Sequence, residues 1–362
     1  MRHDVVVVGN GPAGCVTAEK NSADNDIAVV GLKDRRVECA GLISKSGMER
    51  IGVKPGEFIL NTLRGARIFS PGGVKIEVDG GSPKAYAVDR LAFDNHLLNR
   101  AVGAGATYVD DVVSSINGGV KLRSGTVVEA DRIVLATGTD YTLQKKAGMD
   151  YPREFLFGGQ YEMKVECDQE FVELYFTVPD FFAWVIPLGD RARVGLCVKS
   201  NPRPYLNSFV KKLSSDGRLK SDKVLAESFG IIPIHRPSMR TQYKNIVAVG
   251  DAAAQVKVST GGGIIFGAVA AEYACSPDYE RLWRREIGFD LKLHLMIHRL
   301  LARLPPKGKD RLFRIIKENH NSLERSGDMD YAAKTLSGLA ASPRFLTHLL
   351  TNAPWLVRDM IF

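Results

Sequence analysis

Short unbroken runs of apolar residues mark the first part of the chain. The runs at 5–8 and 27–30 are rich in valine, which is typical of parallel strands buried on both faces. A glycine-rich turn over 9–14 follows the first run, and a helix is expected to begin near Pro12. The pattern therefore predicts a βαβ unit over residues 1–45.

The pattern changes further along the chain. Runs at 133–138 and 246–250 predict two more buried strands, whereas residues 155–200 alternate apolar and polar positions, as in an antiparallel sheet. Short strands are also expected over 66–88 and 105–138. Helices are expected over 89–103, 203–228, 263–274 and most of 278–360.

This order of elements predicts an α/β fold. We expect a three-layer, Rossmann-like nucleotide-binding domain, an inserted antiparallel β-sheet domain and a C-terminal helical region. The nucleotide-binding domain is expected to be discontinuous, over 1–65, 89–150 and 236–280. The inserted substrate or catalytic domain is assigned to 66–88 and 151–235, and the helical region to 281–362.

Three glycine-centred segments each close a β-branched run, around Gly9, Gly138 and Gly250. In the first, Gly9 permits a tight turn, Gly11 lets the backbone approach a pyrophosphate, and Gly14 lets the next helix pack close to the strand. The helix N-terminus then points its free N–H groups at the phosphates. A chain that returns three times to one nucleotide indicates an enzyme that binds flavin adenine dinucleotide (FAD).

One expected group is missing from this motif. The second strand should end in an acidic residue that holds the adenosine ribose, but residue 31 is glycine and the next acid is Asp34. The ribose is then held by Asp34, by the backbone or only loosely. Lys33, Arg35 and Arg36 either contact a phosphate or are simply solvated.

Candidate flavin ligands follow the last predicted strand. Asp251 comes between that strand and a helix, so its carboxylate either accepts hydrogen bonds from the ribityl hydroxyls or caps the helix. The backbone of Gly261–Gly263 is expected to approach the isoalloxazine ring. A helix that begins there would stabilise the anionic reduced flavin.

Composition bounds the class of protein. The 362 residues are 45% hydrophobic and 25% charged, which is typical of a folded protein with room for two domains. No apolar run reaches the ~18 residues of a membrane-spanning helix, and no signal peptide is expected. The five cysteines are scattered without a CxxC pair, so we expect a cytoplasmic location, no disulfide and no metal site.

The positive charge of the chain is concentrated near its C-terminal end. Residues 281–317 hold eleven Lys or Arg and three acids, an excess equal to the net charge of +8 for the whole chain. Basic and apolar residues recur there at helical spacings, which indicates docking on an anionic membrane surface. The alternative is a core-packed helix pair with a solvated basic face. No nucleic-acid-binding motif accompanies the charge, so no nucleic-acid partner is expected.

The glycine motif at 9–14, the helix start at 89–94 and Gly250-Asp251 resemble the para-hydroxybenzoate hydroxylase-like flavoproteins. Within that group the chain is most similar to the geranylgeranyl reductases, which saturate isoprenoid chains, notably of archaeal ether lipids. Residues 179–187, Pro-Asp-Phe-Phe-Ala-Trp-Val-Ile-Pro, are similar to the P-x-x-Y-x-W-x-F-P motif of that family. The stretches 250–264 and 38–42 resemble its other flavin-contacting segments.

The resemblance implies an FAD-dependent oxidoreductase that saturates isoprenoid (geranylgeranyl) double bonds of lipids by hydride transfer from reduced flavin. It assigns Cys39, Phe182 and Trp184 to the catalytic site. The residues that it assigns to FAD are Gly9, Gly11, Pro12, Ala13, Gly14, Cys39, Ala40, Arg90, Ala136, Gly138, Gly250, Asp251, Gly261, Gly262, Gly263 and Ile264.

Each side chain in this set also has a structural interpretation. Cys39 either donates a proton or lines the flavin face, or it is a small buried hydrophobe. Phe182 and Trp184 either wall an apolar slot or form ordinary strand core. Arg90 either reaches the pyrophosphate or forms a surface salt bridge.

The chain departs from the family at several positions. Phe182 replaces a tyrosine and Ile186 an aromatic residue, and Ala136-Thr137-Gly138 replaces the Asp-Gly of related hydroxylases. That last segment is thought to help with the pyridine nucleotide, so the external electron donor is either NAD(P)H or a ferredoxin-like protein. A basic surface would suit an acidic donor.

Two alternatives remain open. The first is a monooxygenase or halogenase of the same fold, because residues 182–187 are close to a halogenase W-x-W-x-I-P motif. A halogenase needs a positioned lysine, and Lys75 and Lys84 lie in no matching motif. The second is a non-catalytic protein that binds flavin or lipid at the membrane. For the reductase, a cytoplasmic protein on the membrane periphery is expected.

Overall fold

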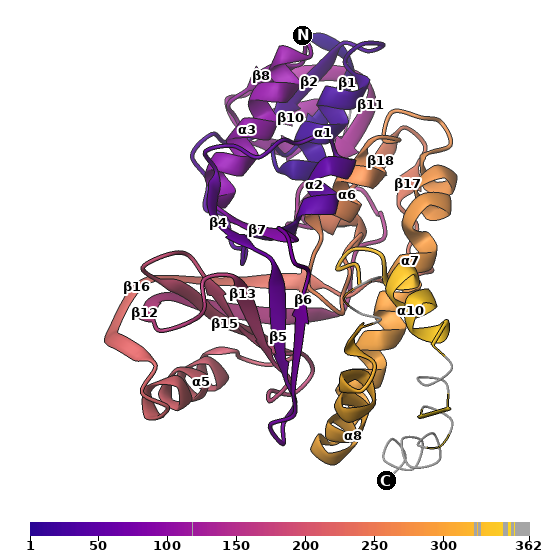
Figure 1. Ribbon diagram of the computed structural model, residues 1–362. Helices are drawn as coiled ribbons and strands as arrows, with labels where there is room; N and C mark the ends of the chain where they lie inside the picture. The colour runs from indigo at the N-terminus through magenta and orange to yellow at the C-terminus, as the bar shows by residue number, and fades with distance from the viewer. Residues whose placement is uncertain (118, 322–323, 325–326, 343–346, 349–350, 352–362) are drawn as a thin grey trace.

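The computed structural model describes residues 1–117, 119–321, 324, 327–342, 347–348 and 351, and Figure 1 traces them. A central β1 (Arg2–Val8) pairs in parallel with β2 (Ile27–Val30) and β11 (Val127–Leu135), and β11 pairs in parallel with β18 (Ile246–Ala248). The buried runs of the sequence are therefore confirmed as neighbouring parallel strands. The sheet is completed by β8 (Thr107–Val109), β9 (Val113–Ser115), β10 (Val120–Leu122) and β17 (Gln242–Tyr243).

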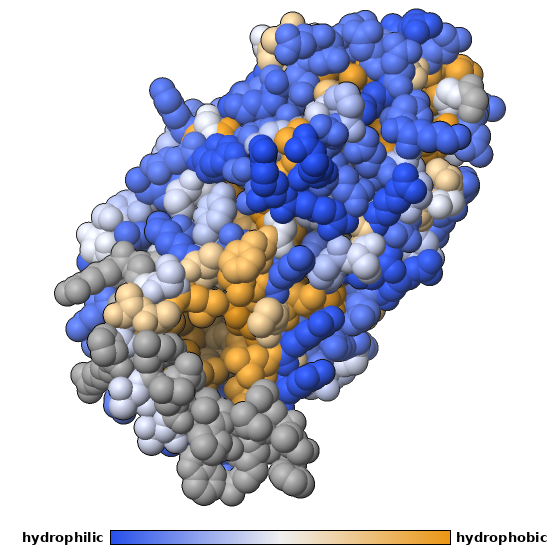
Figure 2. Space-filling view, turned by 90° about the vertical axis from the view of Figure 1, so that its right-hand side faces the viewer, coloured by the Kyte–Doolittle hydropathy of each residue, from blue (hydrophilic) through white to orange (hydrophobic). Residues whose placement is uncertain are grey.

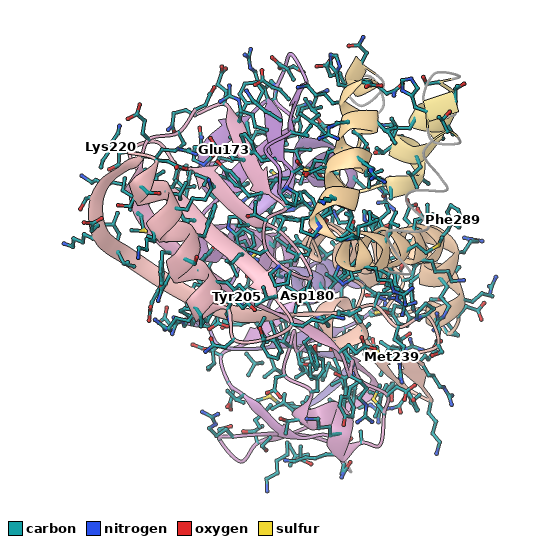
Figure 3. All side chains as sticks on the ribbon, turned by 90° about the horizontal axis from the view of Figure 1, so that it is seen from below. Glu173, Asp180, Tyr205, Lys220, Met239 and Phe289 are labelled. Carbon is teal, nitrogen blue, oxygen red and sulfur yellow. The ribbon has the colours of Figure 1, made fainter. Side chains whose placement is uncertain are left out.

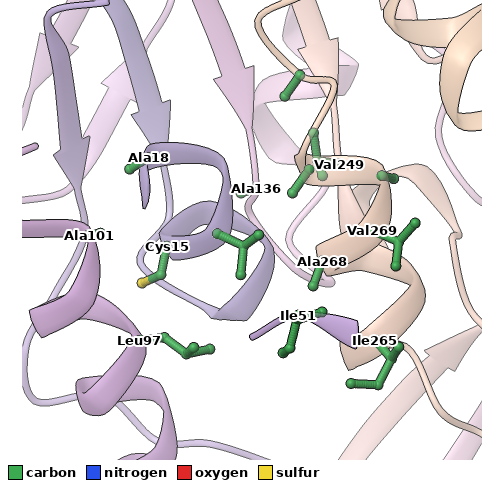
Figure 4. Packing of buried hydrophobic residues seen from close by; sticks show 14 of the residues in the cluster. Cys15, Ala18, Ile51, Leu97, Ala101, Ala136, Val249, Ile265, Ala268 and Val269 are labelled. Carbon is green, nitrogen blue, oxygen red and sulfur yellow. The ribbon is translucent and has the colours of Figure 1, made fainter. Parts of the chain in front are cut away.

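Helices with small buried residues cover one face of this sheet. α1 (Pro12–Asn21) packs against both α3 (Arg90–Gly103) and α6 (Ile264–Ala271). Figure 4 shows that Cys15 and Ala18 of α1 belong to one cluster of buried hydrophobic residues with Ala101 of α3 and Ala268 of α6. Small side chains let helices approach closely, so the first turns of α1 and α6 lie close together. The helices predicted at 89–103 and 263–274 are confirmed.

A second, mostly antiparallel sheet fills the lower half of the molecule in Figure 1. Its strand order is β16-β12-β15-β14-β13-β5-β6, and only β13 and β5 pair in parallel. The strands are β5 (Gly65–Phe69), β6 (Lys75–Asp79), β12 (Phe155–Val165), β13 (Phe171–Tyr175), β14 (Ala183–Pro187), β15 (Ala192–Val198) and β16 (Leu219–Pro233). The alternating pattern of 155–200 is thus confirmed as antiparallel strands.

A small third sheet lies between the two large ones. In it β7 (Ala85–Val88) pairs with β3 (Leu42–Ser44) on one side and with β4 (Ile59–Leu63) on the other. The strands of the predicted segment 66–88 therefore divide between two sheets. The short helix α2 (Lys45–Arg50) packs against β3, whereas α4 (Thr142–Lys146) packs Leu143 against β1 and β2 of the large parallel sheet.

The helix expected over 203–228 is half wrong. α5 (Arg203–Ser215) ends before Gly217, whose φ of +70° lies in the left-handed region that favours glycine. The chain then enters β16, which pairs with β12 from Leu219 to Pro233. Residues 222–227 are exposed, so a helix there would gain no buried face, whereas the strand gains a ladder of backbone hydrogen bonds that overrides local propensity.

The described part of the chain ends in a series of helices. α7 (Tyr279–Arg303) buries Trp283, Ile287, Leu291 and Leu295, which recur every fourth residue. α10 (Ala332–Ala340) packs on α7, and α8 (Pro306–Lys317) lies beside β6. The helical prediction for 278–360 is confirmed over these elements, but its part at 322–323, 325–326, 343–346, 349–350 and 352–360 lies outside the described residues. Within the described chain, no helix combines the length and apolar character needed to cross a membrane.

Candidate active site

One cavity of about 1140 Å³ runs between the two large sheets. This exceeds the roughly 300–1,000 Å³ of an ordinary small-ligand site, so there is room for a cofactor and part of a second molecule. The cavity brings together every residue that the sequence assigned to FAD or catalysis, except Gly14. Gly14 instead packs on the turn, since a Cβ there would be 1.9 Å from the carbonyl oxygen of Gly9.

The glycine turn leaves open space only at Gly11. Gly9 has a φ of +110°, and a Cβ on it would be 2.3 Å from the carbonyl oxygen of Ala136. Gly11 has an ordinary φ of −73°, and the nearest atom to a Cβ on it is Nη2 of Arg35, at 3.9 Å. The first turn of α1 faces this space, as an anion site requires.

Two arginines converge on one buried carboxylate beside this turn. Asp94, on α3, is buried and pairs with Arg35 and, at 3.2 Å, with Arg90. Burial disfavours the charge of Arg90, but the neighbouring Cys39 and Asp94 hold its pKa above the ordinary value. Arg90 therefore forms its ion pair in the cavity wall and not on the surface. Arg35, whose role the sequence left open, also lines the cavity, whereas Asp34 does not.

Asp251 begins the far wall, in a short 3₁₀ turn, η1 (Gly250–Ala253). Its carboxylate makes no capping hydrogen bond and none with another described residue. Burial raises its pKa, and the charge of Arg90 acts in the opposite direction. This arrangement disfavours the helix-cap interpretation and leaves the carboxylate oxygens available to a ligand.

A charged residue lies behind the glycine loop formed by Gly261–Gly263. Lys257, which the sequence reasoning missed, is 3% exposed and pairs with Asp330. Its position in the apolar stretch 252–258 is a signal that the sequence offered. Asp330 lies 73 positions away, and no local signal marks it.

Aromatic side chains line the opposite half of the cavity. The rings of Phe181 and Phe182 stack at 4.0 Å, and Trp184 meets Phe182 edge-on at 6.3 Å. Trp184 lies across Gly195, where a Cβ would come within 2.5 Å of the indole. Beyond them, the apolar lining continues on β5, β6 and α8 and just after β13, as Ile68, Ile76, Val78, Phe313, Ile316 and Phe176. Figure 2 shows a hollow rimmed by apolar side chains on the face that carries α7, α8 and α10.

Two residues that the sequence reasoning missed hold the Cys39 segment against this sheet. Gln160 donates a hydrogen bond to the carbonyl oxygen of Cys39 at 3.0 Å, and Arg193 donates to that of Ala40 at 2.9 Å. Both are buried polar side chains on strands of the second sheet. They tie the segment that lines the cavity to the sheet that carries Trp184.

The described residues contain no cluster of His, Cys, Asp or Glu that could hold a metal ion. All five cysteines are free thiols.

Comparisons with known structures identify the fold. A geranylgeranyl bacteriochlorophyll reductase-like protein from Thermoplasma acidophilum superposes with a TM-score of 0.83 at 22% identity, covering 98% of this chain and 99% of its own. A flavin-dependent brominase superposes with a TM-score of 0.61 at 15% identity, covering 98% and 99%. The fold is therefore the one shared by geranylgeranyl reductase-like proteins and flavin-dependent halogenases, as predicted.

Sequence comparisons identify the family. Digeranylgeranylglycerophospholipid reductase 2 of Methanothermobacter thermautotrophicus is 32% identical over 366 residues, covering 88% of this chain and 92% of that protein. The digeranylgeranylglycerophospholipid reductase of Methanocaldococcus jannaschii is 28% identical, covering 89% and 92%. No family model matches the chain. The chain belongs to the digeranylgeranylglycerophospholipid reductase family, which confirms the resemblance seen in the sequence.

Proposed function

We propose that the protein is an FAD-dependent reductase that saturates isoprenoid double bonds of lipids. The observation that carries this proposal is the single cavity that joins a dinucleotide-type glycine turn to an aromatic and aliphatic slot. The relatives are named for the reduction of a digeranylgeranyl lipid, and such a substrate offers only hydrocarbon at its reacting bonds. The apolar slot suits that chemistry.

The residues at the polar end fit FAD. The open space at Gly11 and the N-terminus of α1 would accept the pyrophosphate, with Arg35 alongside. Asp251 would accept hydrogen bonds from the ribityl hydroxyls, and Gly261–Gly263 would lie against the ring because they carry no side chains. When bound, FAD supplies the hydride; the protein binds, orients and shields the reactants.

The residues at the apolar end would hold the lipid chain. Phe182 and Trp184 are both 8% exposed or less, so they exclude water from the reacting bond. Cys39 lines the cavity beside Arg90 and would either donate the proton or wall the flavin face. The structural alternative of strand core does not conflict with this, since the same rings pack on each other and face the cavity.

The outer face of α7 supports docking on an anionic membrane. Phe289 and Met296 are 66% and 64% exposed, and Arg285, Lys292, Arg299 and Arg303 are exposed on the same helix. Apolar residues among basic ones are typical of an interfacial helix. The hollow of Figure 2 lies on the side of the molecule that carries α7 and α8, so docking there would bring lipid tails to the cavity.

The halogenase alternative has less support. Lys75 is exposed on β6, pairs with Glu77 at 2.8 Å and does not line the cavity. Lys84 lines the cavity but is itself exposed. Neither lysine is enclosed beside Trp184, where a halogenase would need one.

The first experiment is to examine the purified protein for flavin. It should be yellow and should release FAD on heating; a colourless protein that also takes up no added FAD would contradict the proposal.

Dithionite or reduced ferredoxin should bleach the flavin fast and NADPH slowly, because Thr137 stands where related hydroxylases carry an acid. Fast stoichiometric bleaching by NADPH would instead identify NADPH as the donor.

A further inference from the structure

A buried ion pair lies behind the glycine loop of the cavity. The side chains of Lys257 and Asp330 are 3% and 2% exposed, and Nζ also donates to the carbonyl oxygen of Met329 at 3.2 Å. Removing two charges from water costs several kcal/mol per ion, and such pairs often contribute little to stability. A pair kept at this place therefore calls for a role other than holding the fold together.

The ammonium group lies directly against the glycine loop. A Cβ on Gly262 would be 3.0 Å from Nζ of Lys257. The backbone of Lys257 closes the loop, because its N–H donates to Gly262 at 3.1 Å and its carbonyl accepts from Gly261 at 2.8 Å. Lys257, Gly262 and Asp330 all line the cavity.

The carboxylate lies on the other side of the ammonium. Asp330 accepts a hydrogen bond from the hydroxyl of Ser44, and its Oδ2 would be 2.7 Å from a Cβ on Gly47. No atom of Asp330 is among the three nearest to a Cβ on Gly262. The pair therefore presents its positive end to the glycine loop and its negative end to α2.

The neighbouring histidine adds no charge to this arrangement. Nε2 of His294 donates to the backbone carbonyl of Asp330 at 2.9 Å, so Nδ1 is left to accept from Ser259, at 2.6 Å. Burial lowers the pKa of His294 to about 4, so the ring is neutral near pH 7. The charged group nearest Gly262 is then the ammonium of Lys257, whereas the carboxylate of Asp251 lies beside Gly263.

We propose that the ammonium charge of Lys257 raises the reduction potential of the flavin. Asp330 is the positioning residue that holds this ammonium in place. The inference rests on the proposed binding of flavin in this cavity. A flavin gains negative charge on reduction, and a cation in a poorly solvated site stabilises that charge more than one in water. The glycine loop allows this because a side chain on Gly262 would displace the ammonium.

The test is the midpoint potential of the FAD-loaded protein and of three variants, measured by anaerobic spectroelectrochemical titration. Lys257→Met removes the cation and should lower the potential. Asp330→Asn keeps a hydrogen-bond acceptor but removes the opposing charge, so it should raise the potential. We expect each single variant to change the ratio of affinities for reduced and oxidised flavin about tenfold, ~30 mV for a two-electron couple. Shifts in opposite directions distinguish a charge effect from loosened packing, which would move both variants the same way.

The double variant Lys257→Met/Asp330→Asn keeps the test decisive if a single variant fails to fold. It leaves no uncompensated buried charge, and its potential should fall below that of the wild type because the end of the pair nearest the loop is positive. Flavin-loaded variants with the wild-type potential would overturn the inference alone. A wild-type protein that binds no flavin would overturn the proposed function and this inference with it.

Discussion

The carboxylate of Asp251 lies against the backbone of Gly263, so that a Cβ on Gly263 would be 2.6 Å from its Oδ1. The first turn of α6 and this carboxylate thus bound the same part of the cavity. Asp251→Ala should weaken FAD binding about tenfold or more, since hydrogen bonds to a charged group are each worth ~1.5–3 kcal/mol.

The same substitution should leave the apoprotein stable, because the carboxylate of Asp251 has no hydrogen-bond partner among the described residues. Titration with FAD and thermal unfolding of the apoprotein measure the two effects separately. Unchanged FAD affinity would remove Asp251 from the cofactor site. A large loss of apoprotein stability would mean that its role is structural.

The two glycines of the first turn should respond differently to alanine. Gly11→Ala should give a folded, colourless protein, because the backbone there is ordinary and the added methyl group points into the space for the pyrophosphate. Gly14→Ala is the matched control and should disrupt folding, because its methyl group would overlap Gly9. Circular dichroism and bound-flavin absorbance measure fold and cofactor. A folded Gly11→Ala protein with full FAD content would contradict the site.

Stability should fall as the pH drops from about 6.5 to about 4. Burial lowers the pKa of His235, His294 and His298 from the ordinary 6.5 to about 4. In that window the unfolded chain binds protons that the folded chain excludes, so the free energy of unfolding falls by up to about 3 kcal/mol per histidine, at ~1.4 kcal/mol per pKa unit. Above pH 6.5 these histidines are neutral in both states, and this loss is absent.

Urea unfolding at pH 7 and pH 5 measures this loss. The variant His298→Leu removes one of the three titrating groups and should lose less stability between the two values than the wild type. Equal or greater stability of the wild type at pH 5 would contradict the burial of these neutral rings.

The basic and apolar face of α7 should bind anionic vesicles. Each Lys or Arg near such a surface adds about 1 kcal/mol, so Lys292→Glu/Arg299→Glu/Arg303→Glu should abolish sedimentation with phosphatidylserine vesicles at low salt. Phe289→Ser should weaken binding without changing charge. High salt should release the wild type because it screens the attraction.

Lys211→Glu/Lys220→Glu/Lys223→Glu reverses the same number of exposed charges and provides a matched control, since Figure 3 shows Lys220 on the opposite side of the molecule from Phe289. This variant should bind vesicles as the wild type does. Equal loss in both sets of variants would mean that net charge alone drives binding. No binding of the wild type at all would exclude the membrane surface.

The sequence predicted the elements whose pattern is local. The valine runs of β1 and β2, the glycine turn and the antiparallel strands could all be predicted. Burial on both faces produces an unbroken apolar run, and burial on one face produces an alternating pattern. The edge strand β16 was not, since its exposed residues 222–227 follow a helix and gain their structure from pairing with β12. Local propensity does not record such a distant partner.

The candidate site divides in the same way. Glycine-rich segments predicted the glycine-lined end of the cavity, because Gly9, Gly250 and Gly261 adopt left-handed φ angles and Gly11 leaves open space. Lys257 was visible as a charge in an apolar stretch, but its partner Asp330 is brought to it only by the fold of the C-terminal helices. Gln160 and Arg193 likewise act on the Cys39 segment from strands more than a hundred residues away.

Reduction of an isoprenoid double bond by this protein would be recorded in the mass of the lipid product. The FAD-loaded protein, reduced by dithionite without oxygen, is incubated with a geranylgeranyl lipid, and the lipid is analysed by mass spectrometry. We predict a gain of two hydrogen atoms for each bond reduced, with neither oxygen nor halogen added, and reoxidation of the flavin only when lipid is present. A lipid of unchanged mass, or an oxygen-dependent hydroxylation or halogenation of another substrate, would contradict the account.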